Sequence, residues 1–263
     1  MVRLAARVAA LGYLAALLLV PVALVGYRTF AHGVGPVVAA LGSAQAGHAI
    51  ALSLLVTAIS VPVNVVFGVG AGLLLARRRF PGRRLVNLLI DLPFAMSPVV
   101  IGLAMYLLYG RDGWAGRWLG GHGVQVLFSL PGIVLATALV SLPFVVREVV
   151  PVLAELGTDQ EQAAQTLGAG PWRTFWSVTL PAIRWAVVYG VVLSTARSLG
   201  EFGAVSIVSG NVIGRTQTLP LFVEERFRNF DTTGAYSAGF LLAVISLVIL
   251  ATMSLVGRRK ERS

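Results

Sequence analysis

The chain has 263 residues, of which 57% are hydrophobic and 12% are charged, and its mean hydropathy is +0.83. A soluble domain carries about 25% charged residues, so this composition excludes a fold exposed to water on all sides and predicts an integral membrane protein. The net charge of +10 comes from short arginine clusters between apolar runs, which excludes the basic stripe of a nucleic-acid-binding domain, and the lack of cysteine excludes disulfides and thiolate metal sites.

Six apolar stretches are long enough to cross a hydrocarbon core of about 30 Å, which takes about 20 helical residues. They are residues 8–27, 48–76, 85–109, 125–151, 181–206 and 236–257. We therefore expect an all-α bundle of six transmembrane helices. The first helix and an outer loop would occupy residues 1–47, the transmembrane core residues 48–257, and a basic cytoplasmic tail residues 258–263.

The first span follows Arg3 and Arg7, as the apolar core of a secretory signal would. A signal core is usually about 7–15 residues long and is followed by a small-residue cleavage site. The first span is longer, and no clear cleavage site follows it, so we expect a retained helix.

The third span is interrupted by Pro93 and Pro98. Such breaks are tolerated in a membrane where neighbouring helices or a wet cavity satisfy the freed backbone groups. Asp91, which lies beside Pro93, is expected to cap the broken helix rather than to gate a passage.

The orientation in the membrane follows from the basic residues of the loops, which concentrate on the cytoplasmic side. Fourteen of the 21 Lys and Arg residues lie on the side of the N-terminus, six lie on the other side, and Arg197 lies within a span. Both termini are therefore predicted to be cytoplasmic.

The loop between the fourth and fifth spans has the pattern of a short helix. Thr158 and Glu161 have the spacing of a capping box, in which each side chain bonds the other residue's backbone N–H. Asp159 lies in the first turn, where the helix dipole favours negative charge, and Gly168 supplies a C-terminal stop. Pro171 is expected to open a second short helix with aromatic residues suited to a membrane interface.

This helix has two interpretations: it rests on the inner leaflet, or it docks a cytoplasmic partner. Helices that lie on a membrane usually carry Lys and Arg on the polar face. The loop has no basic residue between Arg147 and Arg173, so docking is favoured. Ala163, Ala164 and Leu167 would form its apolar face.

Two charged residues of the fifth span, Arg197 and Glu201, are one helical turn apart. An arginine at the centre of a membrane helix costs about 2.5–3.5 kcal/mol, so these groups should face the bundle interior or water. An internal ion pair is favoured over the alternative, in which Arg197 lowers the electrostatic barrier to an anion. Ser97 and Glu201 are further candidates for such a path. The outer segment 224–228 is either a solvated charge run or a contact for an external protein.

The chain offers no catalytic or nucleotide-binding set of its own. A P-loop needs a lysine after a Gly-rich turn, and the single lysine, Lys260, has no such turn before it. His32, His48 and His122 fall in or beside outer loops and have no partner set for a metal or a protease. A secondary transporter would be expected to show broken helices and often internal repeats; the third span is broken, but no repeat is apparent.

The segment Glu161-Gln-Ala-Ala-Gln-Thr-Leu-Gly168 resembles the EAA loop of permease subunits in type I ATP-binding-cassette importers, although its second residue is glutamine. Residues 91–100, 143–151, 196–204 and 215–225 resemble W-type permeases of sulfate and thiosulfate importers. The resemblance covers residues 48–255. The phrase at 197–203 is shared with molybdate and tungstate permeases, which are the alternative, whereas Thr-Gln-Thr-Leu-Pro-Leu-Phe-Val-Glu-Glu at 216–225 favours sulfate.

The resemblance implies a bacterial inner-membrane complex of two permeases, two cytoplasmic ATPases and an extracytoplasmic sulfate-binding protein. The second permease would be a related T-type subunit. ATP and Mg²⁺ would be used by the ATPases, no cofactor would bind this chain, and lipid but no nucleic acid would surround it. Within the coupling loop 154–180, the residues implied to couple to the ATPase are Thr158, Asp159, Glu161, Gln162, Ala163, Ala164, Thr166, Leu167 and Gly168.

Overall fold

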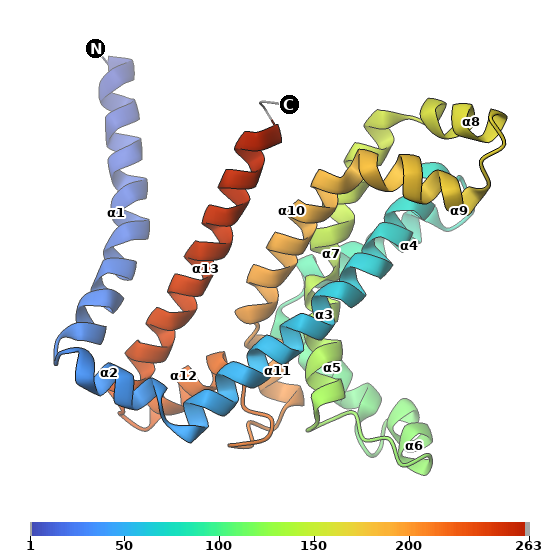
Figure 1. Cartoon of the computed structure of the whole chain (residues 1–263). Helices are drawn as coiled ribbons and strands as arrows, with labels where there is room; N and C mark the ends of the chain where they lie inside the picture. Colours follow the sequence, from blue (N-terminus) through green and yellow to red (C-terminus); the bar gives the residue numbers. More distant parts are fainter. Residues whose placement is uncertain (1, 261–263) are drawn as a thin grey trace.

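The computed structural model describes residues 2–260 as an all-α chain (Figure 1). Its helices are α1 (Val2–Phe30), α2 (Val34–Leu41), α3 (Ala44–Arg77), α4 (Arg83–Ala95), α5 (Pro98–Tyr109), α6 (Trp114–Gly121), α7 (Leu130–Leu156), α8 (Asp159–Thr166), α9 (Pro171–Thr174), α10 (Leu180–Leu199), α11 (Gly203–Val208), α12 (Leu219–Arg228) and α13 (Thr232–Lys260). A π-helical segment, Phe175–Thr179, joins α9 to α10. The expected basic tail falls partly outside this description, because residues 261–263 are not described.

Five helical stretches are long and apolar enough to cross a membrane, and a sixth crossing results if α4 and α5 count as one bent span. The five are Ala10–Phe30, Ala44–Arg77, Leu130–Leu156, Pro171–Leu199 and Thr232–Ile249. The predicted helical membrane bundle is therefore confirmed.

The third span is bent far more sharply than an interrupted helix requires: α4 and α5 meet at 114°. Met96 and Ser97 are extended between them. The residue before a proline is biased away from the helical conformation, so Pro98 forces Ser97 out of the helix and then begins α5 itself. The predicted interruption is confirmed, but only Pro98 lies at the break, because Pro93 lies inside α4.

The limits of two other spans also differ from the sequence prediction. The fourth begins at Leu130 rather than at residue 125, because Phe128 has a positive φ of 57° and Ser129 is extended before Pro131. The fifth ends at Leu199 rather than at residue 206. Gly200 follows, and α11 is a separate short helix.

The centre of the bundle is α7, against which α3 and α10 pack. Glycines allow the close approach: a Cβ on Gly68 would lie 2.6 Å from Val145 Cγ1, and one on Gly72 would lie 2.8 Å from Val149 Cγ1. Helix α10 approaches the same residue, because a Cβ on Gly190 would lie 3.0 Å from Val145 Cα. The core is consequently formed by α3, α7 and α10, whose backbones lie too close together for a larger side chain at these glycines.

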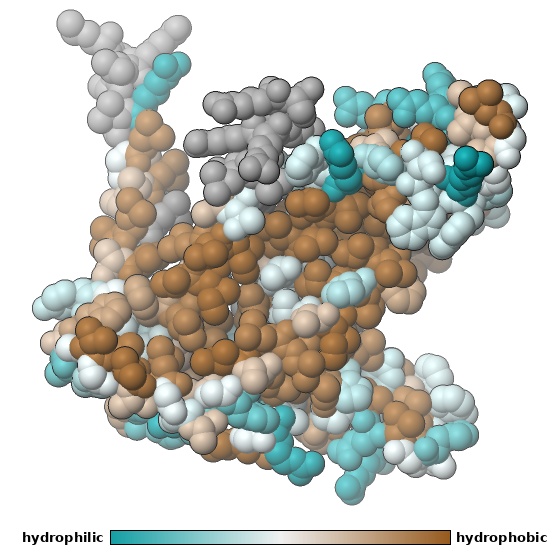
Figure 2. Space-filling model, viewed as in Figure 1, coloured by the Kyte–Doolittle hydropathy of each residue, from teal (hydrophilic) through white to brown (hydrophobic). Residues whose placement is uncertain are grey.

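The two ends of the molecule differ in what they carry (Figure 1). Helix α1 begins, and α13 ends, at the same end as α8 and α9, whereas α2, α6 and α12 lie at the opposite end. Figure 2 shows an apolar belt between polar regions that include α8 and α9 at one end and α6 and α12 at the other. This arrangement matches a span across hydrocarbon with two hydrated ends.

Candidate functional site

Helix α8 lies where the sequence predicts a short helix in the coupling loop. Thr158 is its N-cap residue, and Gly168 stops it with a φ of +86°. The Gly168 N–H donates to Gln165 O at 2.9 Å, and the Ala169 N–H donates to Ala164 O at 3.0 Å. These bonds satisfy carbonyls that the end of a helix leaves free, so the predicted helix and its stop are confirmed.

The surface of α8 is open. No residue of α8 is buried, and Leu167, just after it, is 89% exposed. The neighbours Asp159, Gln162, Ala163 and Thr166 are exposed as well, and Ala164 is half-buried. An apolar side chain this exposed, beyond the ends of the membrane helices, has no partner within the described part of the chain.

The predicted capping box at the start of α8 is wrong. Thr158 makes no side-chain cap; its Oγ1 instead accepts from Gln162 Nε2 at 2.9 Å. Glu161 turns away from the backbone of Thr158 because the guanidinium of Arg77 and the hydroxyl of Thr179 hold its carboxylate. Its Oε2 lies 3.1 Å from Arg77 Nε, and its Oε1 accepts from Thr179 Oγ1 at 2.9 Å.

Arg77 joins several elements at this place. Its Nη1 donates to Leu153 O in the last turn of α7 at 2.6 Å, and its Nη2 donates to Glu161 Oε1 at 3.1 Å. The side chains of Arg77 and Glu161 are 14% and 18% exposed. Of the residues implied to contact an ATPase, Glu161 is therefore the one whose side chain points back into its own chain.

Pro171 opens a short helix after α8, as predicted, but this helix is continuous with the fifth span. Helix α9, the π segment and α10 run on as one stretch, Pro171–Leu199. The π segment accommodates Pro181, which has no N–H to donate, and the Leu180 N–H reaches Phe175 O. Trp172 and Trp176 are 74% and 51% exposed at its start, in a position suited to a membrane interface.

Arg197 and Glu201 form the predicted ion pair, with 2.7 Å between Arg197 Nη2 and Glu201 Oε2. Their predicted place, well inside a continuous helix, is wrong: Arg197 is in the last turn of α10, and Glu201 follows its end. Glu201 is 2% exposed and also accepts from the Ala204 N–H at 2.8 Å at the start of α11. The pair thus joins two consecutive helices, and Arg197 remains 29% exposed.

Ser97 is exposed at the break between α4 and α5. This break lies beside the one between α10 and α11, because a Cβ on Gly203 would be 2.8 Å from Pro98 Cβ. The structure therefore brings the segments of Ser97 and Glu201 together. No hydrogen bond or ion pair joins Ser97 to Arg197 among the described residues.

A buried polar cluster between α3, α7 and α10 was not predicted. Asn64 Nδ2 donates to Ser141 Oγ at 2.8 Å and to Ser194 Oγ at 3.4 Å, and Ser198 Oγ donates to Ser141 Oγ at 3.2 Å. The sequence signal is weak, because only Asn64 stands out in an apolar run, whereas isolated serines are common in membrane helices.

A second unpredicted pair joins α4 to α7. Arg147 Nε donates to Asp91 Oδ1 at 2.7 Å, and Arg147 Nη2 contacts Asp91 Oδ2. The expectation that Asp91 caps a broken helix is thus wrong, since Asp91 lies inside α4 and faces a guanidinium. Both side chains stay about two-fifths exposed, at 40% and 43%.

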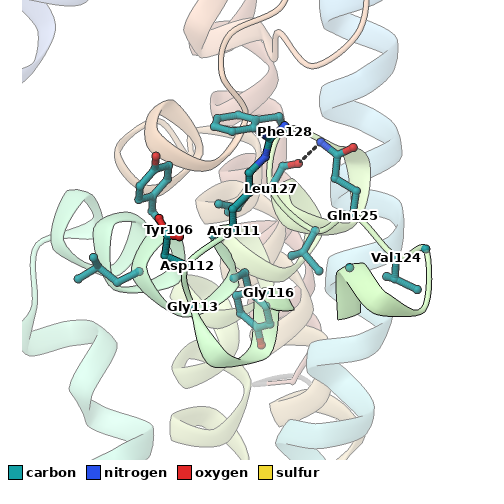
Figure 3. A pocket seen from close by; sticks show the side chains of 15 residues that line it. Tyr106, Arg111, Asp112, Gly113, Gly116, Val124, Gln125, Leu127 and Phe128 are labelled. Atoms are coloured by element: carbon teal, nitrogen blue, oxygen red, sulfur yellow. Dashed lines mark hydrogen bonds between the residues drawn. The ribbon is translucent and has the colours of Figure 1, made fainter. Parts of the chain in front are cut away.

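The opposite end of the molecule has a cavity of about 790 Å³ between α5, α6 and the loop before α7 (Figure 3). Tyr106, Arg111 and Asp112 line it, and Gln125 Nε2 donates to Leu127 O at 3.0 Å in its wall (Figure 3). None of these residues was predicted as a site.

The charged segment 224–228 at the same end is more ordered than a solvated run. Arg226 Nη2 donates to Gln45 Oε1 at 2.6 Å, and Arg226 Nη1 donates to Asp231 Oδ2 at 3.1 Å. Arg228 is 76% exposed and pairs with Glu224. Arg226 thus joins α12 to α3, whereas Arg228 is more exposed to water than Arg226.

Comparison with known proteins identifies relatives along nearly the whole chain. The family model described as "binding-protein-dependent transport system inner membrane component" matches residues 68–262. The "sulfate transport system permease protein CysW" of Synechococcus elongatus is 51% identical over 250 residues, which are 95% of this chain and 87% of that protein. The CysT permease of the sulfate transport system of Escherichia coli is 41% identical over 211 residues, which are 80% of this chain and 76% of that protein.

The fold is also known from a solved structure. The bacterial alginate ABC transporter in complex with an alginate-pentasaccharide-bound periplasmic protein has a chain that matches with a TM-score of 0.82. The match covers 98% of this chain and 94% of that one at 18% sequence identity. At this identity the likeness establishes the fold alone.

Proposed function

Because this chain belongs to the family of binding-protein-dependent transport system inner membrane components, we propose that it is the permease subunit of an ATP-binding-cassette importer that brings sulfate into the cell. The identity of 51% to a sulfate permease over 95% of the chain carries the choice of sulfate. Thiosulfate, a slightly larger tetrahedral anion of the same charge, is proposed as a second substrate.

The open surface of α8 supports dependence on a separate ATPase. Leu167 is 89% exposed at the end of the molecule where α1 begins and α13 ends, which is the end proposed to be cytoplasmic from the basic residues. The residues proposed to contact the ATPase directly are Gln162, Ala163, Ala164, Thr166 and Leu167. The chain is an inner-membrane permease component, so ATP and Mg²⁺ are proposed to bind the partner ATPases.

The second permease is proposed to be a related T-type subunit. This chain is 41% identical to a CysT protein, so two homologous folds can pack as a pseudo-symmetric pair. The binding protein is proposed to dock at the opposite end, where α6 and α12 lie (Figure 1).

The break between α4 and α5 and the adjoining break between α10 and α11 are proposed to line the anion path within this subunit. Ser97 and Arg197 are the accessible polar residues beside these breaks. Glu201 is proposed to hold Arg197 in place and to cap α11, because it is nearly fully buried.

The proposal is tested with the complex reconstituted in proteoliposomes, using radiolabelled sulfate and the binding protein. We expect uptake to require three things: ATP on the side of the membrane where α8 lies, the ATPase subunits, and the binding protein. Excess molybdate should compete weakly and thiosulfate strongly.

Two results would contradict this function. Sulfate uptake without any ATPase would make the chain a secondary transporter. ATP-dependent uptake of molybdate in preference to sulfate would assign it to the other oxyanion class.

A further inference from the structure

Glu161 and Arg77 form a half-enclosed ion pair whose position suggests a role inside the chain. Glu161 is in the first turn of α8, and Arg77 is in the last turn of α3, 84 residues earlier. Arg77 Nη2 donates to Glu161 Oε1 at 3.1 Å, and Arg77 Nε lies 3.3 Å from Oε1 and 3.1 Å from Oε2 of the same carboxylate. A two-pronged contact fixes orientation as well as distance.

The same guanidinium also holds the end of α7. Its Nη1 donates to Leu153 O at 2.6 Å, one of the carbonyls that a helix C-terminus leaves without an intrahelical partner. Arg77 therefore lies near the negative ends of two helix dipoles, of α3 and α7, and beside a carboxylate. Three acceptors compensate for the loss of hydration at its 14% exposure.

Glu161 extends this contact to the start of the fifth span. Its Oε1 accepts from the hydroxyl of Thr179, which is 5% exposed at the end of the π segment. The carboxylate thus connects α8 to α3 directly, to α7 through Arg77, and to α10 through Thr179.

The helices α3, α7 and α10 are joined a second time, deeper in the bundle, by the cluster of Asn64, Ser141, Ser194 and Ser198. With the glycine contacts at Val145, these bonds leave the three helices little freedom to slide past one another. A displacement of α8 is consequently passed to all three together.

We propose that Glu161 is a positioning residue rather than a contact with the ATPase: with Arg77 and Thr179 it fastens α8 to α3, α7 and α10, so that these helices move as one unit when the ATPase moves α8. This inference rests on the proposed function. In this proposal the exposed residues of α8 bind the ATPase, whereas the inward-facing carboxylate of Glu161 transmits the movement to the membrane helices.

The test uses the full reconstituted complex with Arg77→Gln, Glu161→Gln and the double variant, beside Arg79→Gln as a control at an exposed neighbour. Both single variants should keep the ATPase during purification in mild detergent. Sulfate taken up per ATP hydrolysed should fall on the order of tenfold, within the range of typical coupling effects between sites. Arg79→Gln should behave like wild type.

The double variant decides whether the two residues act together. Residues that share one contact show non-additive effects, so the double variant should be no worse than the worse single one. Thr179→Val keeps the side-chain volume and leaves no charge unpaired, so it should lower the sulfate taken up per ATP by a smaller factor. This variant keeps the test valid even if the charge variants misfold.

Three outcomes would overturn the inference. These are wild-type coupling in Arg77→Gln, additive losses in the double variant, and release of the ATPase by Glu161→Gln but not by Arg77→Gln. The failure of the wild-type chain to copurify with any ATPase would be a different result, because it would remove the proposed function itself.

Discussion

At the scale of single residues, glycines set how close the central helices come. Gly68 of α3 faces Val145 of α7 so closely that an added Cβ would be 2.7 Å from Val145 Cβ. That atom is tied directly to the backbone of α7 and cannot rotate away. Gly70 lies on the same helix but has no atom within 4 Å of an added Cβ.

Gly68→Ala should therefore lower the free energy of unfolding by about 1–3 kcal/mol, as overpacking of a core does. Gly70→Ala should leave it unchanged or raise it by about 0.5–1 kcal/mol, because alanine is the better helix former. Thermal unfolding of the two variants in detergent measures the difference. Equal melting temperatures would mean that α3 does not approach α7 as closely as the structure has it.

The sequence predicts which residues belong to the loop helix better than what each side chain does. Thr158 and Glu161 have the spacing of a capping box, but Glu161 pairs with Arg77, 84 residues earlier in the chain. Local spacing cannot reveal such a partner, since a charged donor brought by the fold outcompetes a backbone N–H. The pair of Arg147 and Asp91 was missed for the same reason.

At the scale of elements, α8 combines a fastened side and a free side. Glu161 faces Arg77, whereas Gln165 and Leu167, the residue just after the helix, are both exposed. Residues two apart in a helix lie on nearly opposite faces. The apolar side of α8 can therefore be tested separately from its other side.

Leu167→Asp should lower the apparent affinity of the ATPase for the permease at least tenfold. The expected cost is about 1.5–3 kcal/mol, the transfer free energy of a buried leucine. Gln165→Asp adds the same charge on the other side and should have a much smaller effect. Affinity measured by titration of the ATPase against the permease in nanodiscs compares the two. Similar losses in both variants would contradict an apolar docking face.

Helix existence could be predicted for nearly all the long elements, because 20 apolar residues are a strong signal. The shapes of the broken elements could not. Pro93 and Pro98 predict a break, but local sequence does not give its angle of 114°, and α5 packs on α11, which lies about 100 residues later in the chain. The end of the fifth span at Gly200 depends on Glu201, whose pairing with Arg197 and Ala204 replaces a continued helix.

At the scale of the whole molecule, the distribution of arginine predicts an orientation that a topology experiment can test. The natural chain has no cysteine, so single cysteines are unambiguous markers. Arg79 lies in the loop after α3, and Val124 lies in the loop before α7, toward the end that carries α6 (Figure 3). Both side chains are exposed.

A membrane-impermeant maleimide added to intact spheroplasts should label Val124→Cys and spare Arg79→Cys. Disrupted membranes should allow labelling of both variants, which controls for accessibility. The reverse pattern in intact cells would invert the proposed orientation and place α8 outside, where no ATP is available.

The exposure of Leu167 also has a consequence for the biogenesis of the protein. A copy made without its ATPase leaves Leu167, just after α8, 89% exposed, and cells remove incorrectly folded copies of a protein through chaperones and proteases. Unassembled subunits would then be degraded while assembled ones persist. Cellular abundance of this permease would then follow the supply of the ATPase.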